Sequence, residues 1–124
     1  IIENIIGDIK DKTCIIIDDT IDTAGTITEA ASLLKRKGAK EIYVYATHAV
    51  LSGNAIEKLE KSEIKEIVFT NTIEIPREKR IKKMKIISIA PFLAEAIGRA
   101  HEGTSMGAVY EKMYEKIDKI MKKC

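Results

Sequence analysis

The run from Thr13 to Ile17 is the feature of this sequence that most limits how the chain can fold. Its residues are apolar or β-branched without interruption, and two aspartates, Asp18 and Asp19, follow it directly. A continuous run of this kind is typical of a strand that is buried on both faces of a parallel sheet. We therefore expect a central strand here, flanked by strands that run in the same direction.

The rest of the chain alternates between helix-like and strand-like patterns. Apolar residues recur with helical spacing from Ile27 to Leu34, and Gly38 lies where it can end that helix. Further strands are predicted at residues 42–46, 66–69 and 85–89, with a short helix at 55–61, a charged loop at 76–85 and two helices that begin near Pro91 and Ser105. This alternation predicts an α/β fold with three layers and a doubly wound, mainly parallel sheet.

Length and charge narrow the classes of protein that remain. A chain of 124 residues is about one domain long, and it begins with Ile1 rather than Met, so we expect a piece of a longer protein. Its 21 basic and 19 acidic residues give a net charge of +2. Such a small charge creates no strong field that would attract nucleic acid or a membrane, so neither is expected as a partner and any ligand site must be local.

The cysteines and the hydropathy pattern favour a cytoplasmic location. Cys14 and Cys124 show neither a metal-binding spacing nor a disulfide framework. No stretch approaches the roughly 20 apolar residues that span a bilayer, and the chain does not start with the basic segment of a secretion signal. We therefore expect an intracellular protein in a reducing compartment.

The residues after the first strand carry the predicted chemistry. In open α/β sheets, ligands collect beyond the carboxyl ends of the strands. Here a turn that contains Gly25 leads into a helix, and such a turn directs several backbone N–H groups and the positive end of the helix dipole toward one point. A phosphate monoester fits a site of this kind. Thr23 and Thr26 can add hydroxyl donors, and Gly25 permits a close approach of the backbone.

Asp18 and Asp19 suit a different part of the same ligand. Carboxylates accept hydrogen bonds from sugar hydroxyls, and they can hold Mg²⁺ that bridges to a diphosphate. Asp and Thr also begin helices as N-caps, and Gly often only makes a turn. Because two like charges at the end of a buried strand have no obvious structural task, the binding interpretation is favoured over capping.

Three other acidic or phosphate-binding classes fit the residues poorly. A phosphoacceptor receiver domain needs a third Asp after a later strand, where this chain has Thr70-Asn71-Thr72. A haloacid-type phosphatase needs two aspartates separated by one residue, whereas Asp18 and Asp19 are adjacent. A Walker-type loop needs Gly-Lys-Ser/Thr, which the sequence does not contain.

The segment from Ile15 to Thr26 resembles the signature that binds 5-phosphoribosyl 1-diphosphate (PRPP) in the type I phosphoribosyltransferase fold. The signature consists of apolar residues, two acids and then Asp/Ser-Thr-x-Gly-Thr. Three further segments are similar to those of ribose-phosphate pyrophosphokinases, in that family's order and near its spacing: Ala46–Gly53, Thr70–Ile73 and Leu93–Gly103. By this resemblance, residues 1–124 form a single C-terminal, phosphoribosyltransferase-like domain of a two-domain chain whose N-terminal domain is absent.

The resemblance implies a reaction and roles for particular residues. A ribose-phosphate diphosphokinase transfers the diphosphoryl group of Mg-ATP to C1 of ribose 5-phosphate and releases PRPP and AMP. Asp18 and Asp19 would face the ribose hydroxyls and the Mg²⁺ cofactor. The residues that would hold the 5-phosphate are Asp22, Thr23, Ala24, Gly25 and Thr26. The family's ATP-binding residues lie upstream of the matched stretch, so ATP would be bound mostly by the absent half, and this chain alone would bind ligand without turnover.

The sequence also suggests structural or regulatory roles for a few other residues. His48 is expected to be a hydrogen-bonded structural residue, His101 to lie near a helix C-terminus, and Cys14 to pack in the core. Ser105 matches a residue of the family's regulatory phosphate site, whereas Gly107 stands where a second Ser is often found.

Two other functions and one structural question stay open. The loop is shared by nucleobase phosphoribosyltransferases, and non-catalytic regulatory proteins associated with PRPP synthetases also resemble these enzymes. The final helix carries an apolar stripe from Tyr110 to Met121, which favours packing within the chain over a contact between subunits. Because the family commonly assembles into dimers and hexamers, a homo-oligomer is expected.

Overall fold

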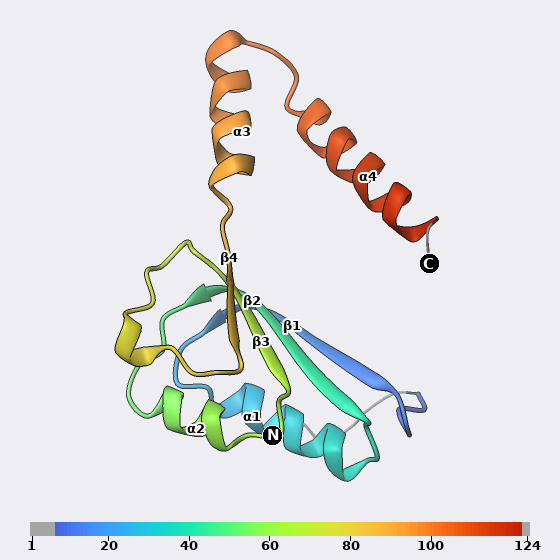
Figure 1. Ribbon diagram of the computed structural model, residues 1–124, viewed down its shortest axis with the longest axis vertical. Helices are drawn as coiled ribbons and strands as arrows, with labels where there is room; N and C mark the ends of the chain where they lie inside the picture. The colour runs from blue at the N-terminus through green and yellow to red at the C-terminus, as the bar shows by residue number, and fades with distance from the viewer. Residues whose placement is uncertain (1–6, 123–124) are drawn as a thin grey trace. The chain divides into compact units, whose positions relative to one another are not determined.

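The computed structural model describes residues 7–122. These residues fall into two units, with the boundary between Ile87 and Ser88. The first unit contains a sheet and its helices, and the second contains two helices (Figure 1). Cys124 and Ile1 lie outside the described residues. The prediction that residues 1–124 form a single domain stays a prediction.

The described part of the first unit holds four parallel strands in the order β1-β2-β3-β4 (Figure 1). Their bounds are β1 Thr13–Ile21, β2 Glu41–Ala49, β3 Glu66–Thr70 and β4 Met84–Ile87. Because all four strands are parallel, their carboxyl ends lie at one edge of the sheet, and the connections that follow them meet there.

Two helices cover one face of this sheet. Helices α1 (Gly25–Arg36) and α2 (Ala55–Lys61) both lie on the same side of it in Figure 1. Successive strands are neighbours, and right-handed crossovers between such strands return on the same face. The predicted α/β class with a parallel sheet is confirmed. Within the described first unit, the opposite face carries exposed apolar side chains, including Ile15 (59% exposed) and Ile17 (80% exposed).

The prediction that β1 is a central strand is wrong for the sheet that residues 7–122 form. β1 pairs with β2 at one end of the strand order. Cys14 and Ile16 pack against the core, whereas Ile15 and Ile17 point away from it. The uninterrupted apolar run therefore correctly predicts that both faces of β1 are apolar, but the described residues cover only one of these faces.

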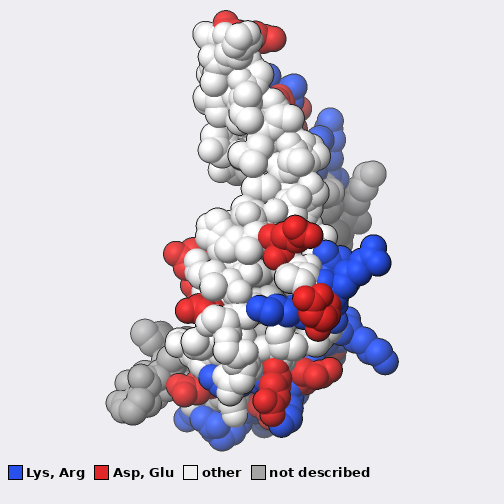
Figure 2. Space-filling model, turned by 90° about the vertical axis from the view of Figure 1, so that its left-hand side faces the viewer, with Lys and Arg blue, Asp and Glu red and all other residues white. Residues whose placement is uncertain are grey.

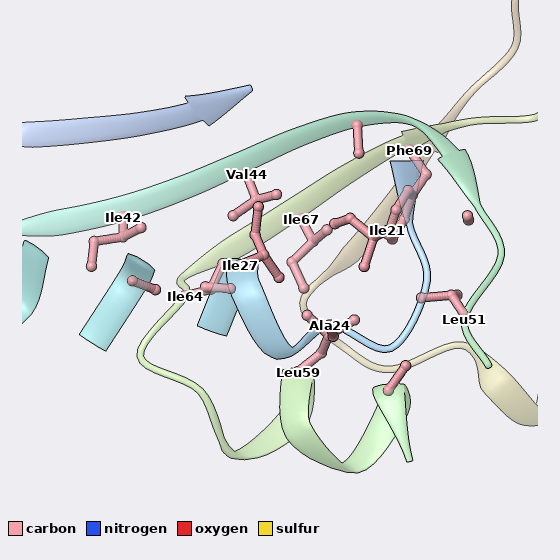
Figure 3. Close-up of a cluster of buried hydrophobic side chains, with 14 of the residues drawn as sticks. Ile21, Ala24, Ile27, Ile42, Val44, Leu51, Leu59, Ile64, Ile67 and Phe69 are labelled. Carbon is pink, nitrogen blue, oxygen red and sulfur yellow. The ribbon is translucent and has the colours of Figure 1, made fainter. Parts of the chain in front are cut away.

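The core lies between the sheet and the two helices. Figure 3 shows side chains of β2, β3 and both helices converging in one cluster. Its largest fully buried side chains are Phe69, Ile42, Leu51, Leu59, Ile67 and Val44. Burying one such side chain contributes about 1.5–3 kcal/mol. The predicted stripe of α1 is confirmed by the burial of Ile27 and Ala31, and Gly38, with φ of 93°, follows the helix as expected.

The charged segment at residues 76–85 contributes more than a solvated loop would. It contains a short 3₁₀ turn at Arg77–Lys79. Lys79 Nζ donates to the Leu51 carbonyl at 3.0 Å, and Lys83 Nζ donates to the Leu59 and Ser62 carbonyls at 3.1 and 2.9 Å. Burial lowers the pKa of Lys83. These lysines satisfy carbonyl groups at the end of α2 and in the connection that precedes it.

The second unit consists of α3 (Ala90–Glu102) and α4 (Gly107–Met121). Pro91 lies in the first turn of α3, and Gly103, with φ of 66°, ends the helix, as predicted. The rings of Phe92 and Tyr110 pack edge to face, with centroids 6.0 Å apart. Glu95 joins the helices through Lys112 Nζ at 2.8 Å.

Within the second unit, every residue of the stripe predicted on α4 is exposed: Tyr110, Met113, Tyr114, Ile117 and Met121. Val109, which lies outside that stripe, is buried. His101 lies in the last turn of α3, as expected. Neither of these helices, nor any other helix in residues 7–122, has the length and apolar character needed to cross a membrane.

Candidate functional site

A cavity of about 220 Å³ opens at the carboxyl end of β1. The last residues of the strand, the following loop and the first turn of α1 line it. The predicted ligand-binding residues that it brings together are Asp18, Asp22, Thr23, Ala24, Gly25 and Thr26. The first unit therefore places a hollow where the sequence predicts a phosphate and ribose site.

Asp19 is not among the described residues that line this cavity. Successive residues of a strand point to opposite faces, so Asp18 and Asp19 diverge. The Asp19 backbone N–H donates to Asp18 Oδ1 at 2.8 Å, which fixes the Asp18 side chain at the strand end. The adjacent acids therefore do not present both carboxylates to one hollow, and their roles remain predictions.

Helix α1 begins without a side-chain cap. Its N-cap residue is Ala24, and no side chain in residues 7–122 caps this end. The first hydrogen bond of the helix runs from the Thr28 N–H to the Ala24 carbonyl at 3.2 Å. The preceding N–H groups, from Ala24 to Ile27, have no partner within the helix. The alternative that the loop's Asp and Thr residues serve as helix caps is therefore wrong, and the residues that carry these N–H groups are among those that line the cavity.

Ala24 adopts an unusual backbone conformation. Its φ of 59° and ψ of 8° lie in the left-handed region, which costs a residue with a Cβ about 1–2 kcal/mol. Ala24 is 5% exposed and belongs to the buried cluster of Figure 3. Strained residues concentrate at functional sites, where the surrounding structure holds them in place. The strain at Ala24 thus coincides with the predicted loop.

The connection after β2 holds the loop from one side. The N–H groups of Val50 and Leu51 both donate to the Ile21 carbonyl at 3.1 Å. The Ser52 N–H donates to the Asp22 carbonyl at 3.1 Å, and the Ser52 hydroxyl donates to the Asp22 carboxylate. Sequence reasoning missed this contact. The sequence does contain a signal for it, because a parallel strand is predicted after α1. The connection at the carboxyl end of such a strand lies beside the loop that follows β1.

A lysine of α2 reaches the loop as well. Lys58 Nζ donates to the Thr23 carbonyl at 3.2 Å. The sequence contains no signal for this contact, because the two residues are 35 positions apart and lysine is common on helix surfaces.

The segment Thr70-Asn71-Thr72 joins the carboxyl ends of two strands. The hydroxyls of Thr70 and Thr72 donate to the Thr47 carbonyl at 2.7 and 2.9 Å. His48 Nδ1 lies 2.9 Å from Thr72 Oγ1, which confirms the expectation that His48 is a hydrogen-bonded residue. Cys14, which packs against the core, is also where it was expected.

The carboxylates can provide only part of a metal site. No group of three or more His, Cys, Asp or Glu side chains within residues 7–122 is arranged to hold a metal ion. Mg²⁺ typically takes one or two carboxylates and completes its shell with water and substrate phosphates. Asp18 at the edge of the cavity fits that kind of incomplete site.

Ser105 belongs to the second unit. Its hydroxyl accepts a hydrogen bond from the Gly107 N–H at 3.2 Å, and its carbonyl accepts one from Arg99 Nη1 at 3.2 Å. These contacts shape the connection between α3 and α4. A role in binding a regulatory phosphate stays a prediction.

Surface charge does not add a broad field to the site. On the part of the first unit that Figure 2 presents, acidic and basic side chains are interspersed. This pattern agrees with the net charge of +2. An anion at the cavity would therefore interact only with local groups, chiefly the uncapped start of α1.

The fold of the first unit and the loop after β1 together indicate the structural class to which the chain belongs. A parallel α/β sheet with an acidic strand end, followed by a glycine-containing loop and an uncapped helix, is the arrangement of the type I phosphoribosyltransferase fold. Within that class, the chain belongs to the family described as the phosphoribosyl synthetase-associated domain, whose model matches residues 2–111. The predicted family resemblance is confirmed.

Similar proteins agree with this assignment. The chain is 57% identical over 107 residues to a ribose-phosphate pyrophosphokinase of Caldanaerobacter subterraneus subsp. tengcongensis, covering 86% of this chain and 34% of that protein. It is 54% identical to the Bacillus subtilis ribose-phosphate pyrophosphokinase, with the same coverage of 86% and 34%. The chain thus spans about one third of the length of these relatives.

A solved structure shows the same fold. The crystal structure of phosphoribosylpyrophosphate synthetase from Mycobacterium smegmatis matches with a TM-score of 0.77 and 45% identity. The match covers 79% of this chain and 33% of that one. Nothing in these comparisons favours a nucleobase phosphoribosyltransferase or a regulatory protein.

Proposed function

We propose that this chain is the ribose-5-phosphate-binding part of a ribose-phosphate diphosphokinase. The whole enzyme transfers the diphosphoryl group of Mg-ATP to C1 of ribose 5-phosphate, giving PRPP and AMP. The observation that carries the proposal is the cavity at the end of β1, where the uncapped N-terminus of α1 meets the Asp22–Thr26 loop. N–H groups without a partner within α1 and the positive end of the helix dipole favour a phosphate dianion at that point.

Each end of the loop suits a different part of the sugar phosphate. Backbone N–H groups and the hydroxyls of Thr23 and Thr26 donate to the 5-phosphate. Asp18 accepts hydrogen bonds from the ribose hydroxyls, and Asp19 contributes from the other side of the strand end. When bound to one of these carboxylates, with water and ligand oxygens completing its shell, Mg²⁺ would supply charge neutralisation for the diphosphate.

This chain supplies binding groups for only one of the two substrates of the reaction. Phosphoryl-type transfer depends mainly on positioning and on neutralising charge around both substrates. This chain corresponds to about one third of its relatives, and we assign the ATP-binding groups to the remainder. The isolated chain is therefore expected to bind ribose 5-phosphate and PRPP without turnover. Homo-oligomeric assembly and a cytoplasmic location belong to the same proposal.

Calorimetric titration of ribose 5-phosphate with Mg²⁺ tests the proposal. The test variant, Thr23→Val with Thr26→Val, removes both exposed hydroxyls without changing side-chain shape. The matched control, Thr13→Val, makes the same change at the other end of β1. A hydrogen bond to a charged group contributes about 1.5–3 kcal/mol, so the double variant should bind at least about tenfold more weakly. The control should bind like the unchanged chain, and a folded chain that binds no ribose 5-phosphate at millimolar concentration would contradict the proposal.

A further inference from the structure

We propose that Lys58 is a positioning residue of the phosphate loop, which orients the Thr23–Ala24 peptide and compensates the acidic lining of the cavity. This inference rests on the function proposed above. Lys58 is not among the described residues that line the cavity, so it acts through the loop rather than on the ligand.

The contact is specific in its geometry. Lys58 Nζ donates to the Thr23 carbonyl at 3.2 Å. The same ammonium lies 3.9 Å from the point that a Cβ on Gly25 would occupy. The side chain is partly buried rather than free in solvent. One cation is therefore placed beside both residues that flank Ala24.

Peptide planarity transmits this contact to the binding side of the loop. In a trans peptide unit, the C=O and N–H bonds lie in one plane and point in opposite directions. Holding the Thr23 carbonyl toward Lys58 thus directs the Ala24 N–H away from Lys58. Ala24 carries one of the N–H groups that have no partner within α1. Lys58 consequently fixes the direction of a donor that the proposed phosphate needs.

The loop requires such a restraint because Ala24 is strained. A residue held in the left-handed region persists only where its surroundings over-determine it. Ser52 holds the loop at Asp22, on one side of Ala24, and Lys58 holds it at Thr23, next to Ala24. Two anchors from the segment after β2 therefore keep the strained residue in place.

The positive charge of Lys58 also affects the electrostatics of the cavity. The cavity lining includes the carboxylates of Asp18 and Asp22, which disfavour a dianionic ligand. An ammonium in contact with the loop offsets this repulsion without occupying the space of the ligand. The Ser52 hydroxyl, which donates to the Asp22 carboxylate, acts in the same direction.

Three variants of α2 test the inference by calorimetric titration with ribose 5-phosphate. Lys58→Met removes the donor and the charge, and it should weaken binding about tenfold. Lys58→Arg keeps both and should restore most of the affinity. Lys61→Met is the matched control, because Lys61 lies on the same helix and pairs with Glu57 at 2.6 Å instead of with the loop. Its affinity should stay within about twofold of the unchanged chain.

An amide NMR spectrum supplies a readout that a merely structural role would not move. In the folded Lys58→Met chain, the Ala24 amide resonance should shift or broaden, and phosphate should move it less than in the unchanged chain. Lys58→Gln, which keeps a donor but no charge, should fall between Met and Arg, and it replaces Met if that variant does not fold. Equal binding by the unchanged chain and by Lys58→Met overturns this inference alone. If the unchanged chain binds no ribose 5-phosphate, the proposed function and this inference both fail.

Discussion

Replacing Gly25 by alanine tests whether this glycine is needed for the folding of the loop or for the binding of a ligand. A Cβ at this position would come no closer than 3.9 Å to Lys58 Nζ or Thr23 Oγ1, which is an ordinary contact distance. The φ of Gly25 lies outside the left-handed region, so an alanine can adopt its conformation. Replacing glycine by alanine at a compatible position stabilises a protein by about 0.4–1 kcal/mol, because the unfolded chain loses freedom. Gly25→Ala should therefore leave the free energy of unfolding unchanged or raise it by roughly 0.5 kcal/mol.

The same substitution should weaken the proposed binding. Phosphate oxygens must come within about 3 Å of the backbone N–H groups at the start of α1. In the proposed placement of the phosphate, a methyl group on Gly25, which would lie 3.9 Å from Thr23 Oγ1, would take up part of that approach. We expect the affinity for ribose 5-phosphate to fall at least tenfold, which corresponds to about 1.4 kcal/mol. Urea unfolding followed by circular dichroism measures the stability, and calorimetric titration measures the affinity.

Gly98 provides the control for this experiment. It lies within α3, and a Cβ there would meet nothing within 4 Å. Gly98→Ala should stabilise its helix by about 1 kcal/mol and leave ribose 5-phosphate binding unchanged. Undiminished binding by Gly25→Ala would refute the placement of the phosphate at the start of α1. A loss of stability above about 1 kcal/mol would show instead that the glycine serves the fold.

Two further predictions concern strain and pH. Ala24→Gly relieves about 1–2 kcal/mol of backbone strain but loses a buried methyl, about 0.8 kcal/mol, and adds chain entropy of about 0.5–1 kcal/mol, so urea unfolding should change little. Ala31→Gly, with an equally buried methyl in the interior of α1, should lose about 2 kcal/mol, and equal losses at the two sites would contradict the assigned strain. In the second unit, the hydrogen bond from Lys112, aided by Arg99, holds the pKa of Glu95 below its ordinary value of 4.5. This stabilisation is present above pH 4.5 and is lost as the pH falls through the lower folded pKa, so helix content measured between pH 7 and 3 should fall more in the unchanged chain than in Glu95→Gln.

Local sequence patterns were enough to predict the secondary-structure elements and the position of the loop that follows β1. The apolar run from Thr13 to Ile17 became a strand, the stripe at Ile27 and Ala31 became the buried face of α1, and Gly38 followed the end of that helix. These outcomes could be predicted because side-chain periodicity and turn chemistry act over a few neighbouring residues. The loop from residue 22 to 26 could be placed at the carboxyl edge for the same reason: it directly follows the strand.

The way in which these elements meet depends on long-range packing, which short sequence patterns do not specify. Strand order placed β1 at the end of the described sheet, and the alternation of side chains turned Asp19 away from the cavity that Asp18 lines. Lys58 and Ser52 reach the loop across 35 and 30 positions of sequence, and such contacts depend on which strands are neighbours. The left-handed Ala24 could not be predicted, because an isolated alanine avoids that conformation and adopts it here only with burial and tertiary hydrogen bonds around it.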